Sequence, residues 1–474
     1  LLAAFITLFG LVAYQSLPKE QFPEVTFPTI LVTTPYPGAS PADIENLISK
    51  PIEEEINTIS GVKDIRSNSI QDLSTVVVEF EVSENPDEVK QLVKDAVDRS
   101  KSELPSDLDN EPRIRKVEIQ DQPIMYINLA GDFGDRRLKG IAENIQDRIE
   151  RLQAINRVDI IGARQREIQV NVDLYRLHSS SLSLSDIQRA IQQENVTISG
   201  GLVDMNELEY ALRVTGEFEA VKELRELVVR SPRGGSAVYL KDIAEVRDGF
   251  EDRDSYARLN GEKGVTLNVI KRGGENLIRT ADDVHAILVE MQENELPAGL
   301  ELDVIGDTSD RTQAELNNLI NTIIIGFLLV TVVLMFFMGV NNALFVGLAV
   351  PLSAFVTFSI IPAFGFTMNI VVLFALLLAL GILVDNAIVV VENIYRIFDG
   401  GRRSIGYAAK YGAAEVFLPV LAGILTTLAP FFPLLFWPGI TGEFMKFLPI
   451  TLIITLSASM FVAFIINPVF AASF

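Results

Sequence analysis

The stretch from Asn369 to Arg396, NIVVLFALLLALGILVDNAIVVVENIYR, decides how the rest of the chain is organised. As an α-helix it would be about 42 Å long, enough to cross a hydrocarbon core of roughly 30 Å. Asp385 lies near its middle, and no charged residue occurs from Leu319 to Val384. A carboxylate at that depth costs about 2.5–3.5 kcal/mol on insertion scales. The stretch therefore predicts a membrane helix that carries an acid near mid-depth.

Two interpretations of Asp385 remain open. In the first, the carboxyl group is satisfied between packed helices and holds Asn386 or a nearby threonine in a hydrogen-bonded network. In the second, burial disfavours the ionised form, so that the group gains and loses a proton during function. Ionisable groups inside a membrane are costly and usually functional, which favours the second interpretation.

The sequence GILVDNAIVVVENIYR, residues 381–396, resembles the fourth transmembrane helix of the resistance-nodulation-division superfamily, in its hydrophobe/amphiphile efflux branch. The resemblance implies proton-driven export (antiport) of hydrophobic or amphiphilic compounds by the inner-membrane pump of a tripartite efflux system. It also implies a homotrimer in the bacterial inner membrane, with a large periplasmic domain. The implied partners are a periplasmic adaptor, an outer-membrane channel and membrane lipid. Such a protein is a secondary active transporter rather than an enzyme, and it uses no cofactor.

Composition limits the class of protein further. A chain of 474 residues is too long for one domain, and a hydrophobic content of 49% predicts a partly membrane-embedded protein. The formal charge of −22 argues against nucleic-acid binding, which requires a basic surface. The chain has no cysteine, which excludes a disulfide framework, a thiolate metal site and a cysteine nucleophile.

Further membrane helices are predicted on both sides of a long polar region. Residues 1–17 resemble a truncated first membrane helix rather than a cleaved signal, because no basic segment or small-residue cleavage site is visible. Residues 319–474 contain the other predicted spans. They are Leu319–Met338, Ala343–Phe364, Asn369–Ile394, Gly412–Trp437 and Phe444–Phe470.

The loop between the third and fourth of these spans sets the orientation. Residues 396–410 carry four basic side chains against Asp399 alone, which predicts a cytoplasmic loop. Counting spans back from it places residues 18–318 outside the cytoplasm. One truncated and five complete helices would make half of a pseudo-duplicated pump, as the resemblance implies.

The polar region predicts an α+β fold of two ferredoxin-like βαββαβ units. Porter unit 1 covers residues 18–119, and porter unit 2 comprises residues 120–165 and 247–308. Residues 166–246 interrupt the second unit as an inserted docking subdomain. The two units form an internal repeat.

Local signals predict finer features of these units. Pro51 is expected to kink the helix that begins at Ser40-Pro41. Strands of the first unit are expected to end at Val82 and Ile119. In the insert, Ser185 is expected to cap a helix, and Gly200-Gly201 to form a hairpin tip.

Gly381, Asp385, Ile388 and Glu392 follow the spacing of one helical face. This spacing predicts that Asp385 faces the bundle interior and that Glu392 lies nearer the cytoplasmic end. Glu392 alone is more often an interfacial residue that pairs with Arg396, four positions on.

Asp385, Asn386 and Glu392 are the candidate proton relay. The resemblance implies two adjacent acids at this point of the helix, matched by a lysine in the other half of the protein. Here the second position is Asn386. A like-charged neighbour therefore cannot favour protonation of Asp385, which leaves the number of protons open.

The resemblance also implies a substrate pocket in the second unit, where Tyr126 and Ile161 match lining positions. Tyr126 on a strand is an ordinary sheet residue just as often. Ile161 is aliphatic where well-studied multidrug pumps carry an aromatic residue. A sterol-like or lipid-like amphiphile is therefore as consistent with the sequence as an aromatic drug.

Two other functions stay open: heavy-metal efflux by the same fold, and a non-exporting relative in protein translocation or lipid transport. A metal route would need Met, Cys or His ligands. We expect the scattered candidates to be structural or exposed, so no metal site is predicted. These candidate ligands are His178, His285, Met125, Met205 and Met291. The chain has no GxxxxGK[ST] motif, so ATP is not expected to drive transport.

Overall fold

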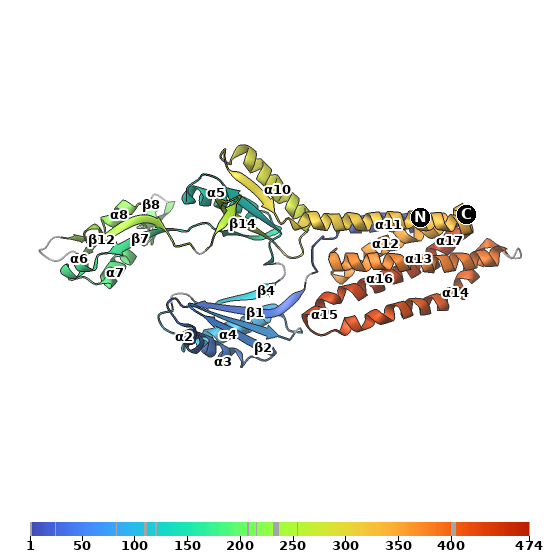
Figure 1. Cartoon of the computed structure of the whole chain (residues 1–474), viewed down its shortest axis with the longest axis horizontal. Coiled ribbons are helices and arrows are strands. Elements are labelled where there is room, and N and C mark those ends of the chain that lie inside the picture. Colours follow the sequence, from blue (N-terminus) through green and yellow to red (C-terminus); the bar gives the residue numbers. More distant parts are fainter. Residues whose placement is uncertain are drawn as a thin grey trace.

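The computed structural model describes residues 2–23, 25–81, 83–108, 111–118, 121–205, 208–214, 216–230, 237–253, 255–399 and 404–473. The molecule is elongated, with a bundle of long helices at one end, two sheet domains in the middle and a small mixed subdomain at the other end (Figure 1). Both chain ends lie near the free end of the bundle (Figure 1). The mixed helix and strand content agrees with the predicted α+β membrane architecture.

The first sheet domain contains β1 (Thr26–Pro35), α2 (Pro41–Ile44), η1 (Glu45–Ser49), α3 (Lys50–Ile56), β2 (Val62–Ile70), β3 (Leu73–Phe80), α4 (Pro86–Ser100) and β4 (Arg113–Glu118). Its antiparallel sheet has the order β2-β3-β1-β4. Alternate residues of β3 are buried, because successive side chains of a strand point to opposite faces. Val76, Val78 and Phe80 pack against Ile52 of α3 and Val93 of α4.

The helix predicted to kink at Pro51 contains a π-helical turn immediately before that residue. In η1 the Lys50 N–H donates to the Glu45 carbonyl, five residues back, and Pro51 follows within the first turn of α3. The N–H groups in the first turn of a helix have no partner within that helix, so the missing N–H of proline costs little there. The helix therefore continues to Ile56. Val82 and Ile119, the predicted strand ends, lie outside the described residues.

The second sheet domain contains β5 (Met125–Ala130), α5 (Asp135–Glu150), β6 (Ile155–Ile161), β13 (Ala257–Leu259), β14 (Glu262–Lys271), α10 (Leu277–Asn294) and β15 (Glu301–Ile305). β14 pairs with β5 and β6, and β15 pairs with the other edge of β5, all antiparallel. Ile127 and Leu267 on one face of the sheet pack against Ile145 of α5 and Val284 of α10. Both long helices, α5 and α10, therefore lie on the same face of this sheet.

The inserted segment contains β7 (Arg166–Val172), α6 (Leu174–Ser179), α7 (Leu184–Glu194), β8 (Ile198–Met205), β9 (Leu208–Val214), α8 (Val221–Arg225), β10 (Val228–Arg230), β11 (Val238–Tyr239), α9 (Leu240–Ile243) and β12 (Ala244–Phe250). β7 and β12 pair antiparallel over their whole length, from Arg166 opposite Phe250 to Val172 opposite Ala244. They form the two chain connections between this subdomain and the second sheet domain.

Two local predictions in the insert are wrong. Ser183, not Ser185, caps α7, because its hydroxyl accepts from the Asp186 N–H while the Asp186 carboxylate accepts from the Ser183 N–H. Gly200 and Gly201 lie within β8 rather than at a hairpin tip. The register shifts between Ser199 and Gly201, as at a β-bulge, where glycine is favoured.

The helical bundle contains α1 (Leu2–Ser16), α11 (Thr308–Met338), α12 (Val340–Ile360), η3 (Ile361–Phe364), α13 (Ile370–Asp399), α14 (Ile405–Leu428), η4 (Ala429–Phe436), α15 (Gly439–Met445), α16 (Phe447–Phe461), η5 (Val462–Ile466) and α17 (Asn467–Ser473). Five helical runs in the described chain are long and apolar enough to cross a membrane. α13 packs against α11, α12, α14 and α16.

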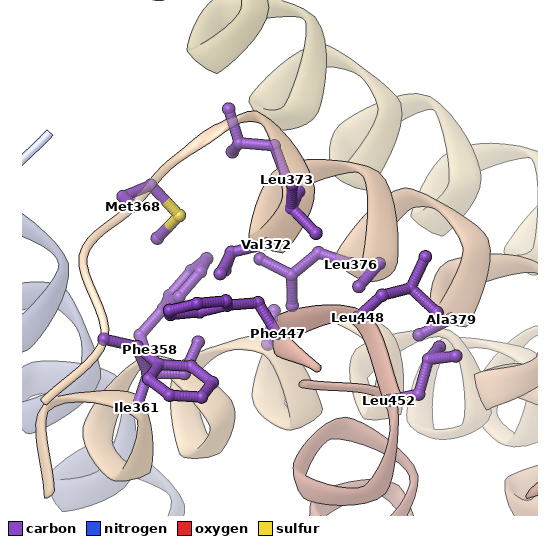
Figure 2. Close-up of a cluster of buried hydrophobic side chains, with 14 of the residues drawn as sticks. Phe358, Ile361, Met368, Val372, Leu373, Leu376, Ala379, Phe447, Leu448 and Leu452 are labelled. Carbon is purple, nitrogen blue, oxygen red and sulfur yellow. The ribbon is translucent and has the colours of Figure 1, made fainter. Parts of the chain in front are cut away.

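The end of the bundle nearest the sheets has a dense apolar core. Figure 2 shows Phe358, Met368, Val372 and Phe447 converging there from different segments. Met368 and Val372 are fully buried. This core supports the segments that connect the bundle to the sheet domains.

Truncation of one isoleucine tests the core of the first sheet domain. Ile52 is fully buried, whereas Ile70 of the same domain is 47% exposed. We expect Ile52→Ala to lower the free energy of local unfolding by about 2–5 kcal/mol, because truncation leaves a cavity. Hydrogen exchange of peptides from residues 26–100 measures this loss. Ile70→Ala is the control. An equal loss of protection from hydrogen exchange in both variants would contradict the assigned core.

Candidate functional site

Asp385 lies on an exposed stripe of α13. Phe374 is 56% exposed and Leu378 is 37% exposed, and Gly381 and Glu392 continue the same stripe. A Cβ built on Gly381 would meet nothing within 4 Å. Within this chain Asp385 therefore faces outward, not into the bundle as predicted. The physical reason is that the described neighbouring helices occupy the other sides of α13.

Asn386 points away from this stripe, into the contact between α13 and α16. It is only 7% exposed. Its Nδ2 donates to Ser459 Oγ at 3.2 Å, and Ser459 Oγ donates to the Leu383 carbonyl at 3.0 Å. Successive helical residues point about 100° apart, so Asp385 and Asn386 belong to different faces. Asn386 therefore fixes α13 to α16 through Ser459.

Arg396 pairs with Glu415 of α14 rather than with Glu392. Its Nη2 lies 3.1 Å from Glu415 Oε2, and its Nε donates to Asn393 Oδ1 at 3.0 Å. Asn393 Nδ2 in turn donates to the Gly412 carbonyl at 2.8 Å. Glu392 is exposed and makes no hydrogen bond or ion pair among the residues that the structure describes.

Sequence reasoning missed Glu415 because the helix containing it follows a separate loop. Gly412 and Glu415 are three residues apart, so they share one face of α14. A Cβ on Gly412 would lie 2.9 Å from Ile394 Cα, which shows how closely the two helices approach. A glycine followed three positions later by an acid was the available signal. The resulting group anchors the Arg396 end of α13 to α14.

Tyr126 and Ile161 lie on one face of the second sheet. Tyr126 is opposite Asn268 of β14, and Ile161 is opposite Thr266 of the same strand. They are 36% and 38% exposed. In Figure 1, α5 and α10 lie above this sheet, on the side away from the first sheet domain. The structure therefore brings the two predicted substrate residues to the same uncovered surface.

The histidine and methionine candidates occupy unrelated places. His178 is exposed on α6, and Met125 and Met291 are fully buried in the second sheet domain. The side chain of Met205 lies outside the described residues. His285 of α10 lies 2.8 Å from Asp307 Oδ2.

Asp307 joins the second sheet domain to α11. Its Oδ1 accepts a hydrogen bond from the Ser309 N–H at 2.8 Å and so caps that helix. Its Oδ2 is hydrogen-bonded to His285 Nε2. Burial would raise the pKa of Asp307, but the hydrogen bonds from Ser309 and His285 outweigh this and hold the pKa below its ordinary value. The carboxylate therefore stabilises the start of α11 in its ionised form.

This depressed pKa predicts a pH dependence. The contribution of Asp307 to stability is present at neutral pH and is lost as the pH falls through its folded pKa, below about 4. At pH 3, the backbone amides of residues 300–312 should lose protection from hydrogen exchange, after correction for intrinsic exchange rates. Asp307→Asn keeps an acceptor for the cap but does not titrate, and should remove this dependence. Asp303→Asn, on exposed β15, is the control.

If Asp303→Asn removed the pH dependence equally, Asp307 would not be its source.

Comparison with known proteins identifies the family of this chain. The profile of the AcrB/AcrD/AcrF family matches residues 1–474. The chain is 30% identical over 471 residues to proteins named "Multidrug resistance protein MdtC" from Shigella boydii serotype 4 (strain Sb227) and Escherichia coli O157:H7 (strain EC4115 / EHEC). A protein of the same name from Shigella flexneri matches equally well.

Each alignment covers 99% of this chain and 46% of the relative, so the chain spans about half the length of the curated relatives it matches. The resemblance noted in residues 381–396 is thereby confirmed over the whole chain. This protein chain belongs to the AcrB/AcrD/AcrF family of resistance-nodulation-division transporters.

Proposed function

We propose that this chain is part of a proton-driven pump that exports hydrophobic or amphiphilic compounds across the cell envelope. The observation that carries the proposal is Asp385, an acid at mid-depth of an apolar helix, on a stripe that no described helix covers. The relatives are about twice as long as this chain. A further helix, with a lysine opposite Asp385, would complete the site.

Asp385 performs the proton step in this mechanism. When ionised, it attracts the facing cation and holds the opposite helix close. When protonated, it loses that attraction, and α13 changes its packing against the opposite helix. Each charge that crosses the membrane supplies roughly 2.3 kcal/mol per 100 mV. Asn386 keeps α13 attached to α16 through Ser459, so the two helices move as one body.

Substrate is handled outside the membrane. The two sheet domains are ferredoxin-like porter units, residues 18–119 and residues 120–165 with 247–308. Residues 166–246 are the docking subdomain. Tyr126 and Ile161 lie on the uncovered face of the second sheet, which supports a role in substrate contact. The pump is a trimer of the bacterial inner membrane, with its sheet domains in the periplasm. It passes substrate to an adaptor and an outer-membrane channel.

Transport by proteoliposomes tests this function. The whole protein that contains this chain is reconstituted, and export of ethidium is followed under an imposed pH gradient. We expect transport that stops when nigericin collapses the gradient and that does not respond to ATP. Transport that survives nigericin would refute proton coupling. A protein that moves no amphiphile but binds an export substrate protein would favour the non-exporting alternative.

A further inference from the structure

The link between α1 and β1, here residues 18–21, is hydrogen-bonded to the residues at the start of α13. The Met368 N–H donates to the Pro18 carbonyl at 2.9 Å, and the Glu20 N–H donates to the Met368 carbonyl at 3.0 Å. The Ile370 N–H donates to the Gln21 carbonyl at 3.3 Å. These bonds form a short parallel pairing between the link and the residues that lead into α13. The start of α13 therefore cannot move without the link.

The same link is also tied to the second sheet domain. The Leu277 N–H, at the start of α10, donates to the Lys19 carbonyl at 2.8 Å. Lys271 Nζ, at the end of β14, lies 2.8 Å from Glu20 Oε1. The Lys271 and Glu20 side chains are only 9% and 7% exposed. A buried ion pair is costly to separate because a lone charge stays away from water, so this contact behaves as a fixed connection.

A small cavity lies beside the ion pair. Its volume is about 60 Å³, and its polar lining comes from Glu20, Gln21, Gln122, Lys271 and Thr308. Glu20 Oε2 is buried and has no hydrogen-bond partner in the described chain. The volume is several times the roughly 10–15 Å³ that one water requires. The carboxylate thus has room to turn about its contact with Lys271.

The link rests on the apolar core at this end of the bundle. Met368 is fully buried beside Phe358, Val372 and Phe447, as Figure 2 shows, and Leu17 belongs to the same cluster. Well-packed interiors transmit displacement because they contain little free space. A shift of α13 that moves Met368, just before the helix, is therefore passed to the link rather than absorbed.

We propose that Glu20 and Lys271 are positioning residues that transmit the movement of α13 to the second sheet domain. The inference rests on the proposed function, in which protonation of Asp385 moves α13. β14 carries Lys271 at its end and pairs with the strands of Tyr126 and Ile161. A displacement of Lys271 along β14 therefore changes the sheet surface on which those two side chains lie.

Transport measurements on the whole reconstituted protein form the first test. We expect Lys271→Met to reduce ethidium export at least tenfold while ethidium affinity stays within twofold. Substrate-stimulated proton flux, followed with entrapped pyranine, should fall by the same factor. Lys263→Met is the matched control, because Lys263 lies on the same strand and is exposed. The double variant Glu20→Lys, Lys271→Glu should restore at least a third of export. Export by Lys271→Met at the control rate would overturn the proposal.

Hydrogen exchange forms a second test that does not depend on export. Peptides from residues 262–277 are compared between the wild type and Asp385→Asn, each with Lys271 or with Lys271→Met. We expect Asp385→Asn to shift their protection only when Lys271 is present. No shift with Lys271, or the same shift without it, would overturn the transmission. Failure of the proposed function is recognised separately, by ethidium export that survives nigericin.

Discussion

Asp385→Asn should lower proton-driven export at least 100-fold in the whole protein that contains this chain. Asparagine has nearly the same shape as aspartate but neither gains nor loses a proton at neutral pH. Asp385 makes no hydrogen bond with the described part of the chain, so the substitution removes charge and titration without removing a contact inside this chain. Initial rates of ethidium export in proteoliposomes with an imposed pH gradient measure the effect.

Two further variants define how specific this loss is. Asp310→Asn makes the same chemical change at an exposed acid in the first turn of α11 and should leave export within twofold. Glu392→Gln should have a smaller effect than Asp385→Asn, because Glu392 lies about 10 Å nearer the end of α13, where water can replace it as a proton carrier. Wild-type export by Asp385→Asn would remove the basis of the proton mechanism.

Gly412→Val should prevent normal assembly of α14 against α13. A Cβ at this position would lie 2.9 Å from Ile394 Cα and 3.1 Å from Ile394 N, and these backbone atoms cannot turn aside like a side chain. Overpacking of this kind costs typically about 1–3 kcal/mol. Separation of the helices would also break the bond from Asn393 to the Gly412 carbonyl and the ion pair of Arg396 with Glu415. We therefore expect a loss at the upper end of that range.

The yield of monodisperse protein in detergent and its thermal aggregation temperature measure this effect. Gly423→Val is the matched control, because Gly423 lies on the same helix and a Cβ there would meet nothing within 4 Å. We expect Gly423→Val to behave as the wild type. If both glycine variants lost yield equally, valine in α14 itself, and not the contact with Ile394, would be the cause.

Elements that depend on neighbouring residues in the chain could be predicted from the sequence. The alternating side chains of Val76, Val78 and Phe80 indicated β3, and the apolar run through Asp385 indicated α13. These signals are local, because burial of one strand face or of a whole membrane helix leaves a pattern in consecutive residues. The exact cap of α7 was missed because Ser183 and Ser185 are similar in type and only two positions apart. The reciprocal bonds of Ser183 with Asp186 decided between them.

Contacts between distant segments could not be predicted in the same way. Lys271 and Glu20 are 251 positions apart, and no periodicity connects them. Arg396 has an acid four positions before it, yet it pairs with Glu415 on the next helix. Which of two acids pairs with an arginine depends on which helices lie close together. At Gly412 that approach is close because the residue has no side chain.

The sequence by itself determined that an acid lies at the centre of an apolar helix and that Gly381, Asp385 and Glu392 share one face of it. Helical geometry is enough for both conclusions, since it relates residues three and four positions apart. Only the tertiary structure decided which sides of α13 are covered. It buried Asn386 against Ser459 and left Asp385 exposed, because helix packing depends on the shapes of several segments at once.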